Sequence, residues 1–143
     1  DLKALSGEPL LNDAAIDAII DRFMRCPSPM GQVVIENFHG AVSRIAPTDT
    51  AYALRASGFN VLVLSQWMAP GDDAACTAWA RETYARMQPF FAPARYVNYL
   101  GDDETGEPVA AAYGPNYQRL RQLKTKYDAT NFFRMNQNIR PLS

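Results

Sequence analysis

The segment Phe59–Trp67 (FNVLVLSQW) constrains the fold of this chain more than any other part of the sequence. Its apolar residues fall on both alternating faces, as expected for a strand in the interior of a sheet. Gln32–Phe38 is β-branched and apolar enough to predict another strand, and Arg95–Leu100 predicts a third. The chain must therefore build a sheet in which Phe59–Trp67 is a central strand.

Helical segments alternate with these strands. Leu10–Arg25 has apolar residues at helical spacing, a second helix is predicted from Pro70 to Pro89, and a third opens at Gly114–Pro115. The predicted inner faces are Ile16, Ile19, Ile20, Phe23 and Met24; Cys76, Trp79, Ala80, Thr83 and Met87; and Tyr117, Leu120, Leu123 and Tyr127.

This alternation is compatible with two architectures. A parallel doubly wound sheet is one, but neither G-x-G-x-x-G nor G-x-x-x-x-G-K-[ST] follows any strand. We therefore predict an α+β fold, an antiparallel sheet with helices packed on one side. Because the chain has no internal repeat and no linker, residues 1–143 are predicted to form one domain.

Charge and composition exclude several classes of partner. Fourteen basic and fifteen acidic residues leave a formal charge of −1, which gives no electrostatic basis for binding nucleic acid or an anionic membrane. No apolar run approaches the roughly 20 residues of a membrane span, so a soluble protein is expected, with a cytoplasmic location favoured. Cys26, Cys76 and the single histidine, His39, lack metal-ligand spacing, so no metal site is expected. Two separate thiols are favoured over a disulfide.

The segment Arg95–Tyr99 (RYVNY) is the most suggestive candidate site. Two phenols and an amide on a short segment suit a planar ligand with polar edges. From composition alone, however, packing aromatics with hydroxyls at the surface are the favoured interpretation. The same choice arises at Asn136–Asn138, where a structural tie to the chain's end is favoured over a ligand role.

A series of motifs in one order shifts the interpretation of Arg95–Tyr99 toward a ligand site. The series is Tyr96-Val-Asn-Tyr99, Tyr113-Gly114, a helix with Lys124, and Tyr127-Asp128-Ala-Thr-Asn131-Phe-Phe-Arg-Met-Asn136-Gln-Asn-Ile-Arg-Pro141. It resembles the C-terminal signature of the berberine bridge enzyme and related FAD-linked oxidoreductases, with the motif covering about residues 93–141. Upstream, Glu36–Ala41 is similar to the family's E-x-x-G-G-A turn and Thr50–Arg55 to its T-A-F-P-H-R segment. Leu54 departs from this pattern, since it replaces the histidine.

The resemblance implies a partial substrate domain of a two-domain flavoprotein, whose antiparallel sheet lies over the flavin ring. The N-terminal FAD-binding domain is absent from the chain, so FAD would be bound mainly by that missing domain. The implied function of the parent is transfer of a hydride to FAD from a C–H bond of an alcohol, sugar or natural-product substrate. The chain alone is then expected to be inactive.

The resemblance also assigns roles to particular residues. Tyr99 corresponds to a catalytic acid/base, and Tyr96 and Asn98 are candidates for holding the flavin ring. Asn60 lies near a position where relatives place a polar group, so it is a candidate for binding substrate. Tyr96 and Asn98 would share one face of a regular strand and Tyr99 the other, so the chain must bend near Tyr99 for all three to reach one site.

A second function from a different class is a freestanding, non-catalytic module that binds a small molecule or a protein. The missing P-H-R histidine and the missing FAD domain favour it. A piece of a larger enzyme should instead expose an apolar face and self-associate through it.

Overall fold

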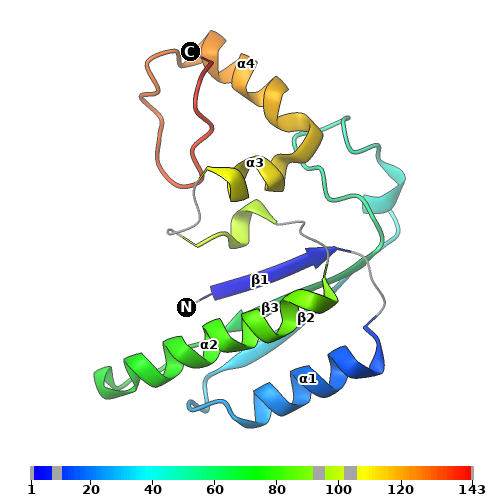
Figure 1. Cartoon of the computed structure of the whole chain (residues 1–143). Helices are drawn as coiled ribbons and strands as arrows, with labels where there is room; N and C mark the ends of the chain where they lie inside the picture. The colour runs from blue at the N-terminus through cyan, green and yellow to red at the C-terminus, as the bar shows by residue number, and fades with distance from the viewer. Residues whose placement is uncertain (1, 8–10, 92–95, 102–105, 143) are drawn as a thin grey trace.

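The computed structural model describes residues 2–7, 11–91, 96–101 and 106–142. These residues form one three-stranded sheet, α-helices and short 3₁₀ turns (Figure 1). The strands are β1 (Leu2–Gly7), β2 (Gln32–Phe38) and β3 (Gly58–Leu64). The helices are α1 (Asp13–Met24), α2 (Asp73–Met87), α3 (Glu107–Tyr113) and α4 (Tyr117–Tyr127). The 3₁₀ turns are Val42–Arg44, Pro70–Asp72, Gln88–Phe90, Val97–Tyr99 and Gly114–Asn116.

The sheet is antiparallel throughout, with β3 between β1 and β2. Val61 pairs with Leu5 on one side and with Ile35 on the other, and Val61 and Val63 are fully buried. The predicted central position of this strand is confirmed, although the strand ends at Leu64 and not at Trp67. β1 was not predicted, and it supplies the second neighbour that a central strand requires.

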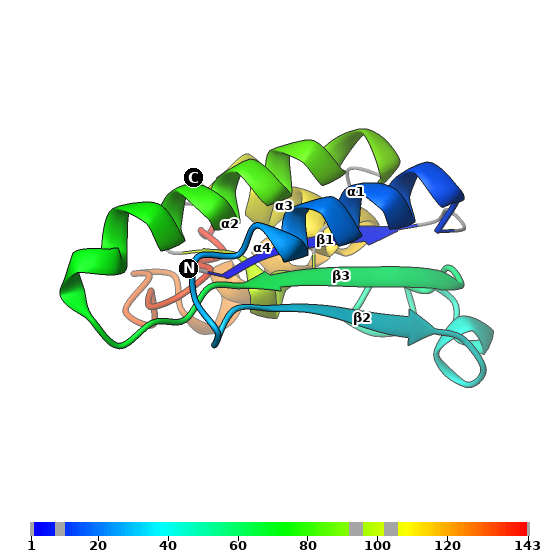
Figure 2. The same ribbon diagram turned by 90° about the horizontal axis from the view of Figure 1, so that it is seen from below.

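α1 and α2 pack on one face of the sheet (Figures 1 and 2). Val63 of β3 packs against Trp79 and Ala80 of α2, with Val33 of β2 beside them. The buried residues of α2 are the five predicted for its inner face. The α+β class with an antiparallel sheet and helices on one side is therefore confirmed.

The buried face of α1 differs from the predicted one. Ala15 and Ala18 are buried against Met87 of α2, and Asn12 caps the helix by accepting a hydrogen bond from the amide of Ala15. Small alanines let the two helices approach closely, so α1 turns its alanine stripe toward the core. Of the predicted inner residues only Ile19 packs there, while four are exposed: Ile16, Ile20, Phe23 and Met24.

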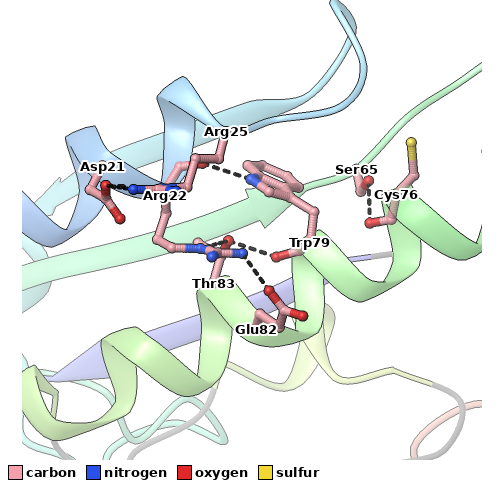
Figure 3. A network of polar contacts seen from close by, with 8 residues as sticks. All are labelled: Asp21, Arg22, Arg25, Ser65, Cys76, Trp79, Glu82 and Thr83. Carbon is pink, nitrogen blue, oxygen red and sulfur yellow. Dashed lines mark hydrogen bonds and ion pairs between the residues drawn. The ribbon is translucent and has the colours of Figure 1, made fainter.

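A network of hydrogen bonds between buried and partly buried polar groups joins α1 to α2 (Figure 3). The indole N–H of Trp79 donates to the carbonyl of Arg22 at 2.7 Å, and Arg22 Nε donates to the hydroxyl of Thr83 at 3.2 Å. The Thr83 hydroxyl in turn donates to the carbonyl of Trp79 at 2.6 Å, and Arg22 pairs with Glu82 at 3.0 Å. Because buried polar groups cost free energy unless they are paired, this network fixes the register of the two helices.

The C-terminal part packs around its own small core of Leu100, Val109 and Ala112. The strand predicted at Arg95–Leu100 is wrong, because Val97–Tyr99 forms a 3₁₀ turn; Arg95 lies outside the described residues. The helix predicted at Gly114–Pro115 begins with the 3₁₀ turn and continues as α4. Of its predicted inner face, Tyr117, Leu120 and Leu123 are partly buried, with Tyr117 packed against this core, and Tyr127 is exposed.

Both cysteines are free thiols, Cys26 partly buried and Cys76 buried, which confirms the prediction of separate thiols. Among the helices in the described ranges, none combines the length and the apolar character required to cross a membrane.

Candidate functional site

The candidate site lies on the face of the sheet that is turned away from α1 and α2. Side chains alternate along a strand, so Val33 and Val63, which pack toward α2, define the helix-covered face. Glu36 of β2 and Asn60 of β3 therefore point to the other face, and they are direct partners in the register. Asn60 is fully buried there.

Glu36 connects three segments of the chain at this face. Its Oε1 accepts a hydrogen bond from the Tyr99 hydroxyl at 3.2 Å, and its Oε2 accepts one from Asn60 Nδ2 at 2.6 Å. Tyr99 lies 63 residues from Glu36 in the sequence. The contacts bring two of the predicted site residues, Tyr99 and Asn60, to one carboxylate.

A row of aromatic rings continues the site away from Glu36. The rings of Tyr99 and Tyr96 meet edge to face with centroids 4.9 Å apart, and Tyr96 meets Tyr52 in the same way at 5.6 Å. The guanidinium of Arg55 lies 4.8 Å from the centroid of the Tyr52 ring. Asn98 Nδ2 donates to the Tyr96 hydroxyl at 2.8 Å. All four predicted site residues thus belong to one connected cluster.

The 3₁₀ turn explains how Tyr96 and Tyr99 reach the same side. Residues i and i+3 lie above one another in a 3₁₀ turn, and here the Tyr99 amide donates to the Tyr96 carbonyl at 2.9 Å. A bend near Tyr99 was required for one site, and the turn provides it.

Two hollows adjoin this turn. One of about 240 Å³ is lined by Tyr52, Leu54, Tyr96 and Asn98 together with Ala51, Val97, Ala112 and Tyr113. The other, of about 500 Å³, shares Asn98 and is lined also by Asn136 and Gln137. Asn98 therefore stands between an aromatic hollow and a more polar one.

Amide side chains anchor the segments that carry the site. Asn116 Nδ2 donates to the carbonyl of Pro47 at 2.7 Å, which ties the loop before β3 to the start of α4. Gln137 Nε2 donates to the carbonyl of Leu100 at 2.8 Å, directly after the 3₁₀ turn. The structural tie favoured for Asn136–Asn138 is therefore present at Gln137. His39 is exposed, in the turn that follows β2.

Burial and the negative charge of Glu36 control the protonation of Tyr99. Loss of solvent raises the pKa of the Tyr99 phenol, and the charge of Glu36 and its hydrogen bond raise that pKa further. The pKa of Tyr52 is also raised, mainly by burial and then by Tyr96. Tyr99 is consequently a neutral phenol that donates to a carboxylate, and the surroundings do not stabilise phenolate.

The place of Glu36 in this site was not predicted, although Glu36 begins the Glu36–Ala41 motif. The available signal was one carboxylate within the otherwise mostly apolar strand Gln32–Phe38. This carboxylate could be recognised as a site residue only from the strand register, because the pairing of β2 with β3 places Glu36 beside Asn60. Within the described ranges, no group of three or more histidine, cysteine, aspartate or glutamate side chains could hold a metal ion.

Comparison with known proteins relates this chain to a family. Residues 95–140 match the family model "Berberine and berberine like". The uncharacterized FAD-linked oxidoreductase YgaK of Bacillus subtilis (strain 168) is 31% identical over 135 residues, covering 94% of this chain and 30% of that protein. The tetrahydroberberine oxidase of Berberis wilsoniae is 26% identical over 146 residues, covering 91% and 27%.

The fold agrees with these relatives. A glycopeptide hexose oxidase solved in complex with teicoplanin superposes with a TM-score of 0.86 at 25% identity, covering 99% of this chain and 32% of that one. The chain belongs to the berberine-bridge-enzyme-like group of FAD-linked oxidoreductases. It spans 27–30% of the length of the two curated relatives described above, so it corresponds to part of such a protein.

Proposed function

We propose that this chain is the C-terminal part of the substrate domain of a flavin-dependent oxidoreductase, which transfers a hydride from a substrate C–H bond to FAD. In this proposal residues 93–141 are the berberine-type motif, and the FAD-binding domain lies N-terminal to the chain. FAD supplies the two-electron acceptor when it is bound. The chain supplies one wall of the site, so by itself it is inactive.

The observation that carries the proposal is the connected cluster of Tyr99, Glu36 and Asn60 on the face of the sheet away from α1 and α2. Tyr96 and Asn98 lie beside it at the hollow of about 240 Å³. A phenolic hydroxyl and an amide match the donors and acceptors along the polar edge of a flavin ring. These residues fit the cofactor, and in the proposal Tyr96 and Asn98 hold it.

Tyr99 acts on the substrate in this proposal. Asn60, predicted to bind substrate, is fully buried and donates to Glu36, so it acts through Glu36. The oxygen of the neutral Tyr99 phenol can accept a hydrogen bond from a substrate hydroxyl while its own proton points to Glu36. The substrate class is an alcohol, a sugar or a natural product. The names of two relatives, tetrahydroberberine oxidase and glycopeptide hexose oxidase, support oxidation of such compounds.

The test is the colour and the reactivity of the full-length protein that contains this chain. We expect a yellow protein whose flavin is bleached under anaerobic conditions by at least one compound in a panel of hexoses, primary alcohols and alkaloid amines. A colourless protein that cannot be reconstituted with FAD would contradict the proposal and would favour the binding module.

A further inference from the structure

We infer that Glu36 is a positioning residue of the oxidation, which receives, through the Tyr99 hydroxyl, the proton that leaves the substrate. This inference rests on the proposed function and adds a residue to its site. It applies to substrates whose oxidised carbon carries a hydroxyl group.

Hydrogen bonds fix the orientation of the Glu36 carboxylate. Asn60 is fully buried on the central strand and donates to Oε2 at 2.6 Å, at the short end of the range for a bond to a carboxylate. With one oxygen held, the other is directed at the Tyr99 hydroxyl, 3.2 Å away. That distance exceeds the usual O–H···O value, and catalytic hydrogen bonds are often long until substrate is bound.

The surroundings of Tyr99 set the direction in which its hydroxyl proton can move. Burial and the charge of Glu36 raise the pKa of Tyr99, so Tyr99 is a poor base when it acts alone. A phenol that donates to a carboxylate can take up a proton at its oxygen only as it releases its own. Glu36 is the acceptor in contact with that hydroxyl.

The proposed oxidation balances in electrons and protons. As the C–H hydride leaves the carbinol carbon with both electrons for the flavin, the C–O bond becomes a carbonyl. The hydroxyl proton moves to the Tyr99 oxygen, and the Tyr99 proton moves to Glu36. The products are a carbonyl compound, the two-electron-reduced flavin, an unchanged Tyr99 and a neutral Glu36.

Other titratable and charged groups near Glu36 belong to the aromatic row. The charge of Glu36 reaches Tyr52 as well as Tyr99, and Tyr96 stands between their rings. Arg55 lies on the outer face of Tyr52. Within the described side chains, the hydroxyl bonded to Glu36 is that of Tyr99, so a pH effect of Glu36 should be transmitted through Tyr99.

The experiment compares Glu36→Gln with Glu107→Gln in the full-length protein. Glutamine keeps the shape of Glu36 but has one acceptor oxygen where Glu36 uses two, one for Tyr99 and one for Asn60. Glu107 is an exposed carboxylate in the first turn of α3. The first readout is an ultraviolet titration of tyrosine, taken as the difference between each protein and its Tyr99→Phe version. The second is the pH profile of kcat/KM for the hexose or alcohol that bleaches the wild-type flavin.

We expect Glu36→Gln to lower the titration midpoint of Tyr99, because a negative charge that disfavours phenolate is removed. We also expect kcat/KM to fall by about 10²-fold or more. The pH profile of the variant should differ from that of the wild type, because the variant lacks the carboxylate that accepts the proton. Glu36→Asp should recover part of the rate, and Glu107→Gln should match the wild type.

If Glu36→Gln leaves the titration midpoint of Tyr99 unchanged, or has the same pH profile as the wild type, Glu36 only connects β2 to β3 and has no role in proton transfer. Those results would leave the proposed function intact if the protein binds flavin and oxidises a substrate. If the wild type binds no flavin, the proposed function and this inference both fail.

Discussion

At the scale of single residues, Tyr99 joins Glu36 to the row of aromatic rings, because its hydroxyl donates to Glu36 and its ring contacts Tyr96. Tyr99→Phe keeps the ring that contacts Tyr96 at 4.9 Å and removes the hydroxyl that donates to Glu36. We expect the rate of flavin reduction in the full-length protein to fall by about 10²–10⁴-fold, the range typical of a positioned acid or base. Stopped-flow absorbance of the flavin under anaerobic conditions measures this.

The matched control is Tyr127→Phe, since the Tyr127 side chain is exposed at the end of α4. That variant should reduce its flavin at the wild-type rate. If Tyr99→Phe also does so with an unchanged flavin spectrum, Tyr99 has a packing role and no role in proton transfer.

Asp128 is a second residue with a defined electrostatic task. Its carboxylate pairs with Lys124 at 2.5 Å and accepts hydrogen bonds from the amides of Phe132 and Phe133 at 2.7 and 3.1 Å. The bond to Lys124 is the main cause that lowers the pKa of Asp128 below its usual 3.8, and the two amides contribute. We expect Asp128→Asn to lower the melting temperature at neutral pH.

The sign of the pH dependence follows from the lowered pKa. A carboxyl with a lower pKa in the folded state stabilises the fold above its unfolded pKa, and this contribution is lost as pH falls through the folded pKa. The difference in melting temperature between Asp128→Asn and wild type should therefore shrink below about pH 4. Asp49→Asn, at an exposed loop position, serves as the control. A difference that does not depend on pH would contradict this account.

The candidate site was only partly predictable from the sequence. Tyr96, Asn98 and Tyr99 stand in a short motif. Their residue types alone favoured packing aromatics, and the resemblance of the motif to the family signature favoured a ligand site. Glu36 was missed because its partners, Asn60 and Tyr99, are 24 and 63 residues away, and the contact depends on register and on a local turn.

At the scale of elements, the junction of α1 and α2 depends on a fully buried threonine. Thr83→Val keeps the volume of the side chain but removes the hydroxyl that accepts from Arg22 and donates to the Trp79 carbonyl. Because Arg22 Nε then loses its acceptor in a half-buried site, we expect the free energy of unfolding to fall by about 1–3 kcal/mol. Denaturant titration followed by tryptophan fluorescence measures this.

Thr77→Val makes the same chemical change on the same helix at a partly exposed position. Its effect on the free energy of unfolding should stay within about 0.5 kcal/mol. Equal effects of the two variants would show that the hydrogen bonds between the helices contribute nothing specific.

The predictability of the elements follows from how local their causes are. Every residue of the buried face of α2 was predicted, because the spacing of apolar residues along a helix is a local feature of the sequence. β1 was missed, since Leu2–Gly7 becomes a strand by pairing with residues about 60 positions away. α3 was not predicted, because Gly106 and Pro108 are typical of turns; here Gly106, with φ of 74°, stands directly before the helix.

At the scale of the whole molecule, the distribution of apolar residues indicates a surface that is normally covered. Four residues of α1 (Ile16, Ile20, Phe23 and Met24) and the neighbouring-strand residue Ile35 are 40–77% exposed, and we call them the α1 patch. The four helix residues recur at i, i+4, i+7 and i+8, so they form one stripe. A contiguous apolar stripe of this kind marks an interaction site more often than an accident of composition.

If the rest of the parent protein normally covers this stripe, the chain by itself should associate through it. We expect sedimentation velocity to show that the isolated chain self-associates as its concentration rises and that it binds a hydrophobic dye. The double variant Ile20→Gln/Met24→Gln should stay monomeric and bind less dye, because it removes two of the more exposed apolar side chains of the patch.

The matched control is Met68→Gln/Met135→Gln, which removes two methionines that are each 84% exposed but lie outside α1. This variant should associate like the original chain, since its apolar loss falls elsewhere on the surface. Equal association of both double variants would mean that exposed apolar area in general, and not the α1 patch, holds the copies together. Monomeric behaviour of the unsubstituted chain at all concentrations would remove the case for a covered stripe altogether.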